Sequence, residues 1–162
     1  MIKLLIEAIK KINEELYIGN GNFEKFNYTF YEPVDKEDLK RFECKYNCTL
    51  PEDYKNFLLI TNGIMFYNSA DFKLFNLDEV IEDKEYMGFK EGIYPIGYIL
   101  EDYIAIDINT ENNNIYVGNA CSGDEYYSLN CNFTVFMDRL IISNITNYWT
   151  WVYPERFYKL LN

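Results

Sequence analysis

The sequence contains no histidine among its 162 residues. Histidine is the side chain that most often serves as a general base near neutral pH, and it is the commonest metal ligand. Its absence excludes the Ser–His and Cys–His pairs of nucleophilic enzymes. A phosphate-binding glycine loop is missing as well, because Gly19 and Gly21 are not followed by the lysine and helix that such a loop requires. The sequence therefore carries no recognisable catalytic constellation.

Basic residues and long apolar runs are also scarce. Fifteen lysines and arginines stand against 26 aspartates and glutamates, a net charge of −11. Nucleic-acid binding requires an excess of basic side chains, so nucleic acid is not an expected partner. No apolar stretch is long enough to span a bilayer. Lys3, Glu7 and Lys10 interrupt the apolar residues of the N-terminal segment, which leaves no secretory signal. We expect a cytoplasmic protein with no membrane partner.

The four cysteines do not have the spacing of a metal site. Cys44 and Cys48 lie one helical turn apart, and Cys121 and Cys131 are ten residues apart. A four-thiolate zinc site is usually built from C-x-x-C pairs, which neither spacing provides. We expect small buried thiols in a reducing compartment, with no metal and no cofactor.

The negative charge is concentrated in the middle of the chain. Residues 71–125 hold 13 acidic and 3 basic side chains, a balance of −10, whereas residues 1–60 have a balance of −2. Two interpretations remain open. The acidic segment can be a solvated surface that maintains solubility. Alternatively, it can be a surface complementary to a basic protein, for example a nuclease domain.

The size and the 49% hydrophobic content are typical of one folded unit, and we expect residues 1–162 to form a single domain. Apolar residues at every third or fourth position predict an amphipathic helix within residues 1–18. The same spacing predicts helices over residues 35–47, 50–63, 76–86 and 133–142. Short or alternating apolar runs predict strands over residues 64–67, 72–75, 94–100, 103–108, 115–118 and 125–129. A C-terminal extension, 146–162, completes the chain.

Strands joined by short turns imply an antiparallel meander. We therefore predict an α+β fold, with a single antiparallel or mixed sheet of about five or six strands and helices packed mainly on one side. The most clearly marked helix is 50–63. Pro51 suits the first helical position, and Tyr54, Phe57 and Leu58 share one face. Asn62-Gly63 is expected to end the helix, because glycine adopts the left-handed cap conformation without steric cost.

The same stretch, LPEDYKNFLLITNG, resembles the SUKH superfamily. The resemblance continues in YPIG at 94–97, YIAID at 103–107, NIYV at 114–117 and FTVF at 133–136, and it covers residues 35–142. Many bacterial members of this family are immunity proteins that neutralise polymorphic toxins. The resemblance therefore implies a non-enzymatic protein that occludes a cognate toxin. A basic toxin, for example a nuclease, would suit the charge of residues 71–125. The expected oligomeric state is a monomer or weak homodimer.

Candidate partner-binding residues are acidic and aromatic side chains at strand ends and turns. They are Glu101, Asp102, Tyr103, Asp107, Asp124, Glu125, Tyr126 and Tyr127. For the tyrosines, packing within the sheet is an equally good interpretation. Two other functions stay open. Eukaryotic members of the family resemble cell-wall and signalling regulators, so a regulatory or scaffold module is one. A carbohydrate-active enzyme that uses two of these carboxylates is the other.

Overall fold

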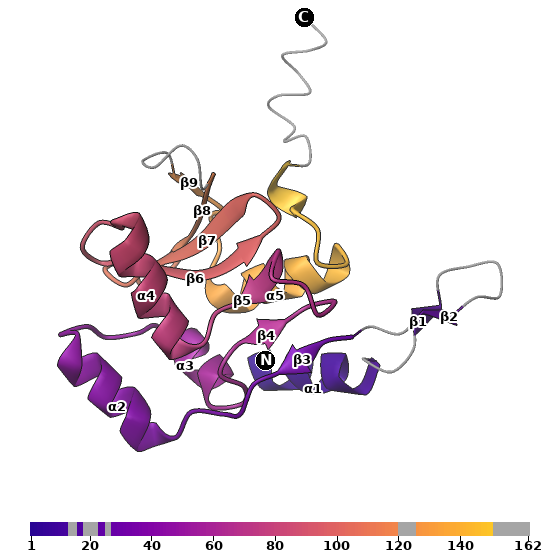
Figure 1. The fold of residues 1–162 in the computed structure, drawn as a ribbon, viewed down its shortest axis with the longest axis horizontal. Coiled ribbons are helices and arrows are strands. Elements are labelled where there is room, and N and C mark those ends of the chain that lie inside the picture. Colours follow the sequence, from indigo (N-terminus) through magenta and orange to yellow (C-terminus); the bar gives the residue numbers. More distant parts are fainter. Residues whose placement is uncertain (13–15, 18–22, 25–26, 120–125, 151–162) are drawn as a thin grey trace, which may run out of the picture.

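The computed structural model describes residues 1–12, 16–17, 23–24, 27–119 and 126–150. Within these residues, helices flank a seven-stranded antiparallel sheet (Figure 1). The strands of the sheet are β3 (Thr29–Phe30), β4 (Ile64–Met65), β5 (Phe72–Leu74), β6 (Ile93–Ile99), β7 (Asp102–Asp107), β8 (Ile115–Asn119) and β9 (Tyr126–Ser128). The helices are α1 (Ile2–Ile12), α2 (Lys36–Lys45), α3 (Glu52–Leu58), α4 (Leu77–Met87) and α5 (Phe133–Ile142), with a short 3₁₀ turn at Tyr148–Thr150. A separate ribbon pairs β1 (Leu16–Tyr17) with β2 (Phe23–Glu24).

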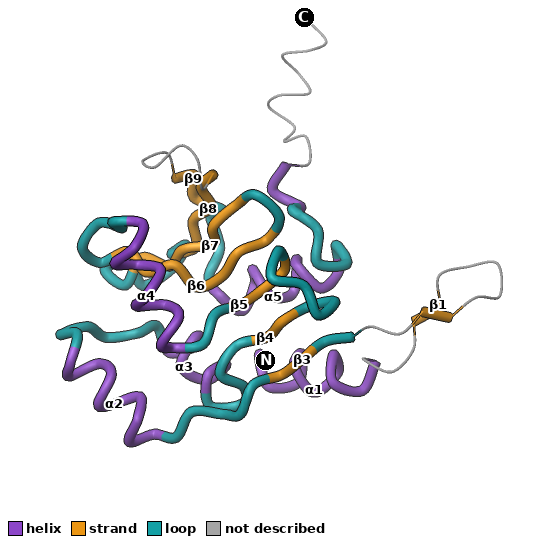
Figure 2. Tube along the Cα trace, in the orientation of Figure 1, coloured by secondary structure: helices purple, strands orange, loops and turns teal. Residues whose placement is uncertain are grey.

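The strand order of the sheet, β3-β4-β5-β6-β7-β8-β9, is the order of the chain. Each strand pairs antiparallel with its neighbours in sequence. Figure 2 shows loops between β4 and β5 and between β6 and β7, whereas α2 and α3 lie between β3 and β4, and α4 lies between β5 and β6. The predicted α+β class and antiparallel sheet are therefore confirmed. The described sheet has seven strands, more than the predicted five or six, because the two residues of β3 add an edge strand.

Polar side chains begin three of the helices. The Asp35 carboxylate, before α2, accepts a hydrogen bond of 2.7 Å from the backbone N–H of Asp38. Asn76 and Glu79 form a reciprocal capping box at the start of α4. The Asn132 side chain caps α5, because its Oδ1 accepts a 3.0 Å hydrogen bond from the Val135 backbone N–H. Such caps satisfy backbone donors that have no partner within the helix. No described helix has the length and apolar character needed to cross a membrane.

Two helices end earlier than predicted. α1 ends at Ile12, and Leu16 belongs to β1, where its backbone pairs with β2. α3 ends at Leu58 rather than at Gly63. The chain has to leave the helix there because β4 begins at the next residue after Gly63 and pairs with β5. Gly63 has a φ of 101°, and a Cβ at this position would lie 2.6 Å from the Leu74 carbonyl oxygen. Gly63 therefore allows the backbone to pass close to β5, and it does not cap α3.

The described cysteines are unpaired thiols, but they are not all buried. Cys48 and Cys131 are buried, as predicted. Cys44 is exposed, because it lies on the outer side of α2. Cys121 lies outside the described residues.

Alternate residues of a strand point to opposite faces of the sheet. Leu74 and Ile104 are buried on one face, which α1, α3 and α5 cover as a contiguous layer. Lys73, Tyr98 and Tyr103 pair across β5, β6 and β7 on the other face. α4 covers that second face and contacts β6 (Figure 1). The sheet therefore has three helices on one side and α4 on the other.

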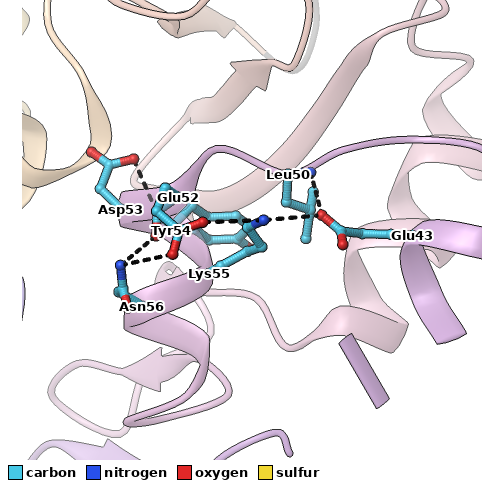
Figure 3. A network of polar contacts seen from close by, with 7 residues as sticks. All are labelled: Glu43, Leu50, Glu52, Asp53, Tyr54, Lys55 and Asn56. Atoms are coloured by element: carbon cyan, nitrogen blue, oxygen red, sulfur yellow. Dashed lines mark hydrogen bonds and ion pairs between the residues drawn. The ribbon is translucent and has the colours of Figure 1, made fainter. Parts of the chain in front are cut away.

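A polar network ties α2 to the start of α3 (Figure 3). The Glu43 carboxylate accepts a 2.9 Å hydrogen bond from the Leu50 backbone N–H. Its Oε1 also lies 3.5 Å from the Lys55 ammonium nitrogen, and both side chains of this ion pair are half-buried. Partly buried charged hydrogen bonds of this kind are stronger than exposed ion pairs.

We expect Glu43→Ala to lower the free energy of unfolding by about 1–2 kcal/mol, because the Leu50 N–H and Lys55 lose their shared acceptor. Urea denaturation of the purified protein measures this loss. Glu37→Ala is the matched control, since it removes a glutamate of the same helix whose ion pair with Lys40 is exposed. Equal losses in the two variants would contradict the structural role of Glu43.

Candidate functional site

The β6–β7 hairpin places two tyrosines side by side. Tyr98 and Tyr103 are cross-strand partners, and their ring centroids lie 5.1 Å apart in an edge-to-face arrangement. Leu100, at the tip of the hairpin, has a φ of 59°. Its N–H donates a 2.6 Å hydrogen bond to the carbonyl oxygen of Asp71. The tip is therefore fixed against the β4–β5 connection.

Two hollows share Tyr98 in their walls. The first, here named the α4 groove, has a volume of about 430 Å³ and is lined by Ala70, Lys73, Phe75, Glu79, Asp83, Met87, Tyr98 and Tyr103. The second, named the hairpin hollow, has a volume of about 570 Å³ and is lined by Asp71, Tyr98, Leu100, Glu101, Asp102, Asn147 and Thr150. Volumes of this order suit a small ligand or a few side chains of a larger partner.

Asp83 brings an unneutralised carboxylate into the α4 groove. The Tyr103 hydroxyl donates a 3.2 Å hydrogen bond to its Oδ1. In the part of the chain that the structure describes, no lysine or arginine forms an ion pair with this carboxylate. The nearby Lys73 is bound to Glu79, and its ammonium nitrogen lies 5.6 Å from the ring centroid of Tyr31. The ion pair of Lys73 is thus made with Glu79, and Lys73 acts on Asp83 only as a nearby charge.

The environment of Asp83 disfavours its charged form. Partial burial raises the pKa of the Asp83 carboxyl. The hydrogen bond from Tyr103 and the nearby charge of Lys73 lower this pKa, whereas the charge of Glu79 adds to the rise. Burial, together with the charge of Asp83, raises the pKa of Tyr103 to about 12. A carboxylate whose charged form is disfavoured by burial, and which lines a hollow, is typical of a functional site.

We expect Asp83→Asn to stabilise the protein at neutral pH. The amide oxygen can still accept the hydrogen bond from Tyr103, and no charge is desolvated. A carboxyl whose pKa is raised by folding favours the folded state below its unfolded pKa, about 4, and loses this contribution as pH rises through the folded pKa. The advantage of the variant should therefore grow from about pH 4 towards neutrality, as measured by urea denaturation at each pH.

Glu82→Gln is the control for this experiment, because it removes one charge from an exposed position of the same helix. The difference in free energy of unfolding between this control and the unchanged protein should vary little between about pH 4 and neutrality. A loss of stability in Asp83→Asn at neutral pH would show instead that the carboxylate stabilises the fold.

Three of the predicted partner-binding residues lie together. Glu101 is exposed at the hairpin tip, and Asp102 begins β7 beside it; both line the hairpin hollow. Asp102 also accepts a 2.6 Å hydrogen bond from the indole N–H of Trp149. Tyr103 lines the α4 groove, where it also packs against Phe75. The Tyr103 ring is half-buried. It therefore both packs within the fold and lines the groove.

The other predicted residues are dispersed. Asp107 lies at the opposite end of β7, where its two oxygens accept hydrogen bonds from the Asn109 N–H and the Thr110 hydroxyl and hold the following loop. Tyr126 packs against Phe89, with ring centroids 5.4 Å apart. Tyr127 is 64% exposed on the edge strand β9. Asp124 and Glu125 lie outside the described residues.

Seven of the residues that line the groove were not among the predicted ones, and four of these carry polar groups: Lys73, Glu79, Asp83 and Tyr98. The acidic residues of α4 belong to a segment whose spacing predicts only a surface helix. Tyr98 could have been found, because a two-residue turn between β6 and β7 makes it the cross-strand partner of Tyr103.

The arrangement does not favour the two-carboxylate hydrolase. Asp107 and Glu101 stand at opposite ends of a six-residue strand. Both oxygens of Asp107 are occupied by its own loop, and Asp102 is held by Trp149. A glycosidase requires two carboxyl groups that face each other across a sugar. Asp71, Asp83 and Glu101 instead line the two hollows that share the ring of Tyr98.

α4 presents an acidic and aromatic outer side. Asp78, Glu82 and Glu85 are exposed at helical spacing, and Tyr86 beside them is 85% exposed. The lysine of the same helix, Lys84, does not neutralise them, because its ammonium group donates to the carbonyl oxygens of the 90–93 segment. Exposed aromatic rings among polar residues are typical of protein interfaces.

Comparison with known proteins identifies the family of this fold. The model of the SMI1 / KNR4 family (SUKH-1) matches residues 33–139, which is more than half of the chain. The chain belongs to the SMI1/KNR4 (SUKH-1) family. It is also similar to two Bacillus subtilis (strain 168) proteins. Uncharacterized protein YobM is 33% identical over 95% of both chains, and Uncharacterized protein YnaB is 30% identical over 86% of this chain and 99% of its own.

The match places the candidate site inside the SUKH-1 unit. Residues 33–139 run from the segment before α2 into α5 and include every residue that lines the α4 groove. The predicted resemblance to the SUKH superfamily over 35–142 is confirmed. α1 and the 3₁₀ turn at Tyr148–Thr150, which supplies Thr150 to the hairpin hollow, lie outside the matched residues.

Proposed function

We propose that this SUKH-1 protein is an immunity protein, which binds a basic protein toxin in the cytoplasm and neutralises it by covering its active site. It catalyses no reaction in this role. Membership of the family supports the proposal, because many bacterial SUKH proteins act in this way. A nuclease is a suitable toxin class, since enzymes that act on nucleic acid present basic surfaces to phosphate.

One observation carries the proposal: the α4 groove and the hairpin hollow adjoin at Tyr98 and are rimmed by acids. The carboxylates of Asp71, Asp83 and Glu101 stand in or beside these hollows, together with half-buried tyrosine rings. The nearest described lysines are held by internal partners. The surface therefore presents negative charge and aromatic area at the same place.

These two features have separate roles in complex formation. Exposed acids accelerate encounter with a basic partner, an effect that weakens as salt screens the charges. Aromatic side chains at the centre of an interface usually contribute most of its stability and slow dissociation. The toxin would be neutralised stoichiometrically, because a protein held over its active site excludes the substrate.

The test starts with capture of the full chain and its partner from native cells, at low salt and again at about 0.5 M salt. A polypeptide recovered only at low salt is then expressed alone and together with this protein in a heterologous host. The proposal expects growth arrest by the polypeptide alone, and rescue by co-expression with formation of a 1:1 complex. A captured partner that is harmless when expressed alone would contradict the immunity role and favour a regulatory one.

A further inference from the structure

We infer that the α4 groove is a socket for one arginine side chain of the toxin. Asp83 receives the guanidinium group, which lies against the rings of Tyr98 and Tyr103. This inference rests on the proposed function for the identity of the partner, and it adds the chemistry by which the partner is recognised.

The groove has the walls that a guanidinium group requires. Tyr98 and Tyr103 are half-buried, so part of each ring faces the groove. Phe75 lies 6.3 Å from the Tyr103 ring, and Phe89 lies 5.7 Å from it, measured between ring centroids. These neighbours hold the Tyr103 ring in place before any partner arrives. A cation over the face of such a ring is attracted by the negative charge of the ring face, and the attraction is stronger where the cation is desolvated.

The groove has an excess of negative charge that one incoming cation would balance. Lys73 forms an ion pair with Glu79; its charge also acts on Asp83, but among the described residues no ion pair joins it to that carboxylate, so the two acids and one lysine leave the groove one negative charge in excess. Lys84 follows Asp83 in sequence, yet its ammonium group donates to the carbonyl oxygens of Lys90, at 2.8 Å, and of Ile93. The protein therefore does not fill the socket with a described lysine of its own.

Arginine fits this site better than lysine. Its guanidinium group is planar, so it can stack on a tyrosine ring while two of its N–H groups reach a carboxylate. Tyr103 donates to Oδ1 of Asp83, and Oδ2 accepts no hydrogen bond from the described residues. A lysine ammonium group can satisfy the charge but cannot stack, and it is more strongly hydrated.

A titration with three small probes tests the socket directly. The probes are the N-acetyl amides of arginine, lysine and citrulline, of which citrulline has the shape of arginine without its charge. The readout is the NMR signals of the tyrosine rings and of the α4 backbone in the full chain. The inference expects saturable shifts at Tyr98, Tyr103 and Asp83 with the arginine probe, weaker shifts with lysine and none with citrulline. Equal shifts with all three probes would overturn it.

Asp83→Asn and Glu101→Gln form a matched pair of variants in this titration. The first removes the charge of the socket, and the second removes an exposed charge that lines only the hairpin hollow. We expect Asp83→Asn to abolish the arginine response, and Glu101→Gln to retain it. With the toxin itself, Asp83→Asn should weaken binding about thirtyfold or more, as for loss of one partner of a desolvated charge pair.

The two proposals fail in different ways. If a toxin is found but Asp83→Asn binds it as tightly as the unchanged protein does, the socket is wrong and the immunity role stands. If the arginine probe binds the groove but no toxin is captured from the native cells, the socket stands and the immunity role is unsupported. A fold defect in Asp83→Asn would appear in its NMR spectrum before any probe is added.

Discussion

Phe133→Ala should lower the free energy of unfolding by about 3–5 kcal/mol. Phe133 is fully buried at the first position of α5. Its ring centroid lies 5.0 Å from those of both Tyr54 and Phe57 on α3. Removal of the ring leaves a cavity between two helices, and the surrounding aromatic rings cannot close it without leaving their own contacts. Urea denaturation followed by tryptophan fluorescence measures the loss, which is a large part of the stability of a domain of this size.

Two further variants give this measurement its controls. Phe133→Leu keeps most of the apolar volume, so it should cost markedly less than the alanine variant. Val135→Ala shortens a half-buried side chain of the same helix turn, and it should also cost less, because a smaller group is lost from a less buried site. A loss in Phe133→Ala no greater than that in Val135→Ala would contradict the central place of the ring.

This aromatic contact also supports the candidate site. The Asp53 carboxylate on α3 accepts a 2.9 Å hydrogen bond from the Thr134 N–H, so α3 and α5 are joined by polar and apolar contacts together. Phe136, one turn along α5, stacks on Trp149, whose indole N–H is bound to Asp102 in the hairpin hollow. Contacts from α5 thereby hold Asp102, which lines the hairpin hollow, through Trp149.

Much of the fold could be predicted from local patterns. The α5 helix begins and ends where its apolar spacing and the cap at Asn132 indicate, and α4 follows from Asn76 in the same way. The end of α3 could not be predicted from its own residues. The LLITNG sequence has helical spacing, but the pairing of β4 with β5 determines where the chain must leave the helix. Tertiary pairing of this kind overrides a local preference.

The candidate site could be predicted only in part. Glu101, Asp102 and Tyr103 are consecutive in the chain, so their proximity follows from a hairpin alone. Asp83 meets Tyr103 only because α4 crosses the outer face of the sheet, and nothing in the sequence specifies that crossing. Asp107 has a structural role that its sequence position did not indicate. Its charge suggested a binding role, whereas its carboxylate holds a turn of its own loop.

Reversal of three exposed charges, Glu82→Lys, Glu85→Lys and Glu101→Lys together, should slow association with the basic toxin by about 100-fold at low salt. The first two residues lie on α4 and the third at the hairpin tip, so the variant changes the surface on which both hollows open. The effect should fall mainly on the association rate, since all three acids are exposed to solvent. Surface plasmon resonance at several salt concentrations measures it, and the difference should shrink as screening increases.

The matched control reverses Glu32, Glu37 and Glu52, which are exposed and lie outside both hollows. This variant has the same net charge as the first, so it separates a general attraction between unlike charges from a local one. At physiological salt we expect its association rate to fall much less than that of the first variant, because Coulomb forces there decay within about 8 Å. Equal slowing in both variants would mean that net charge alone guides the encounter. No slowing in either would mean that the toxin does not approach the surface formed by α4 and the β6–β7 hairpin.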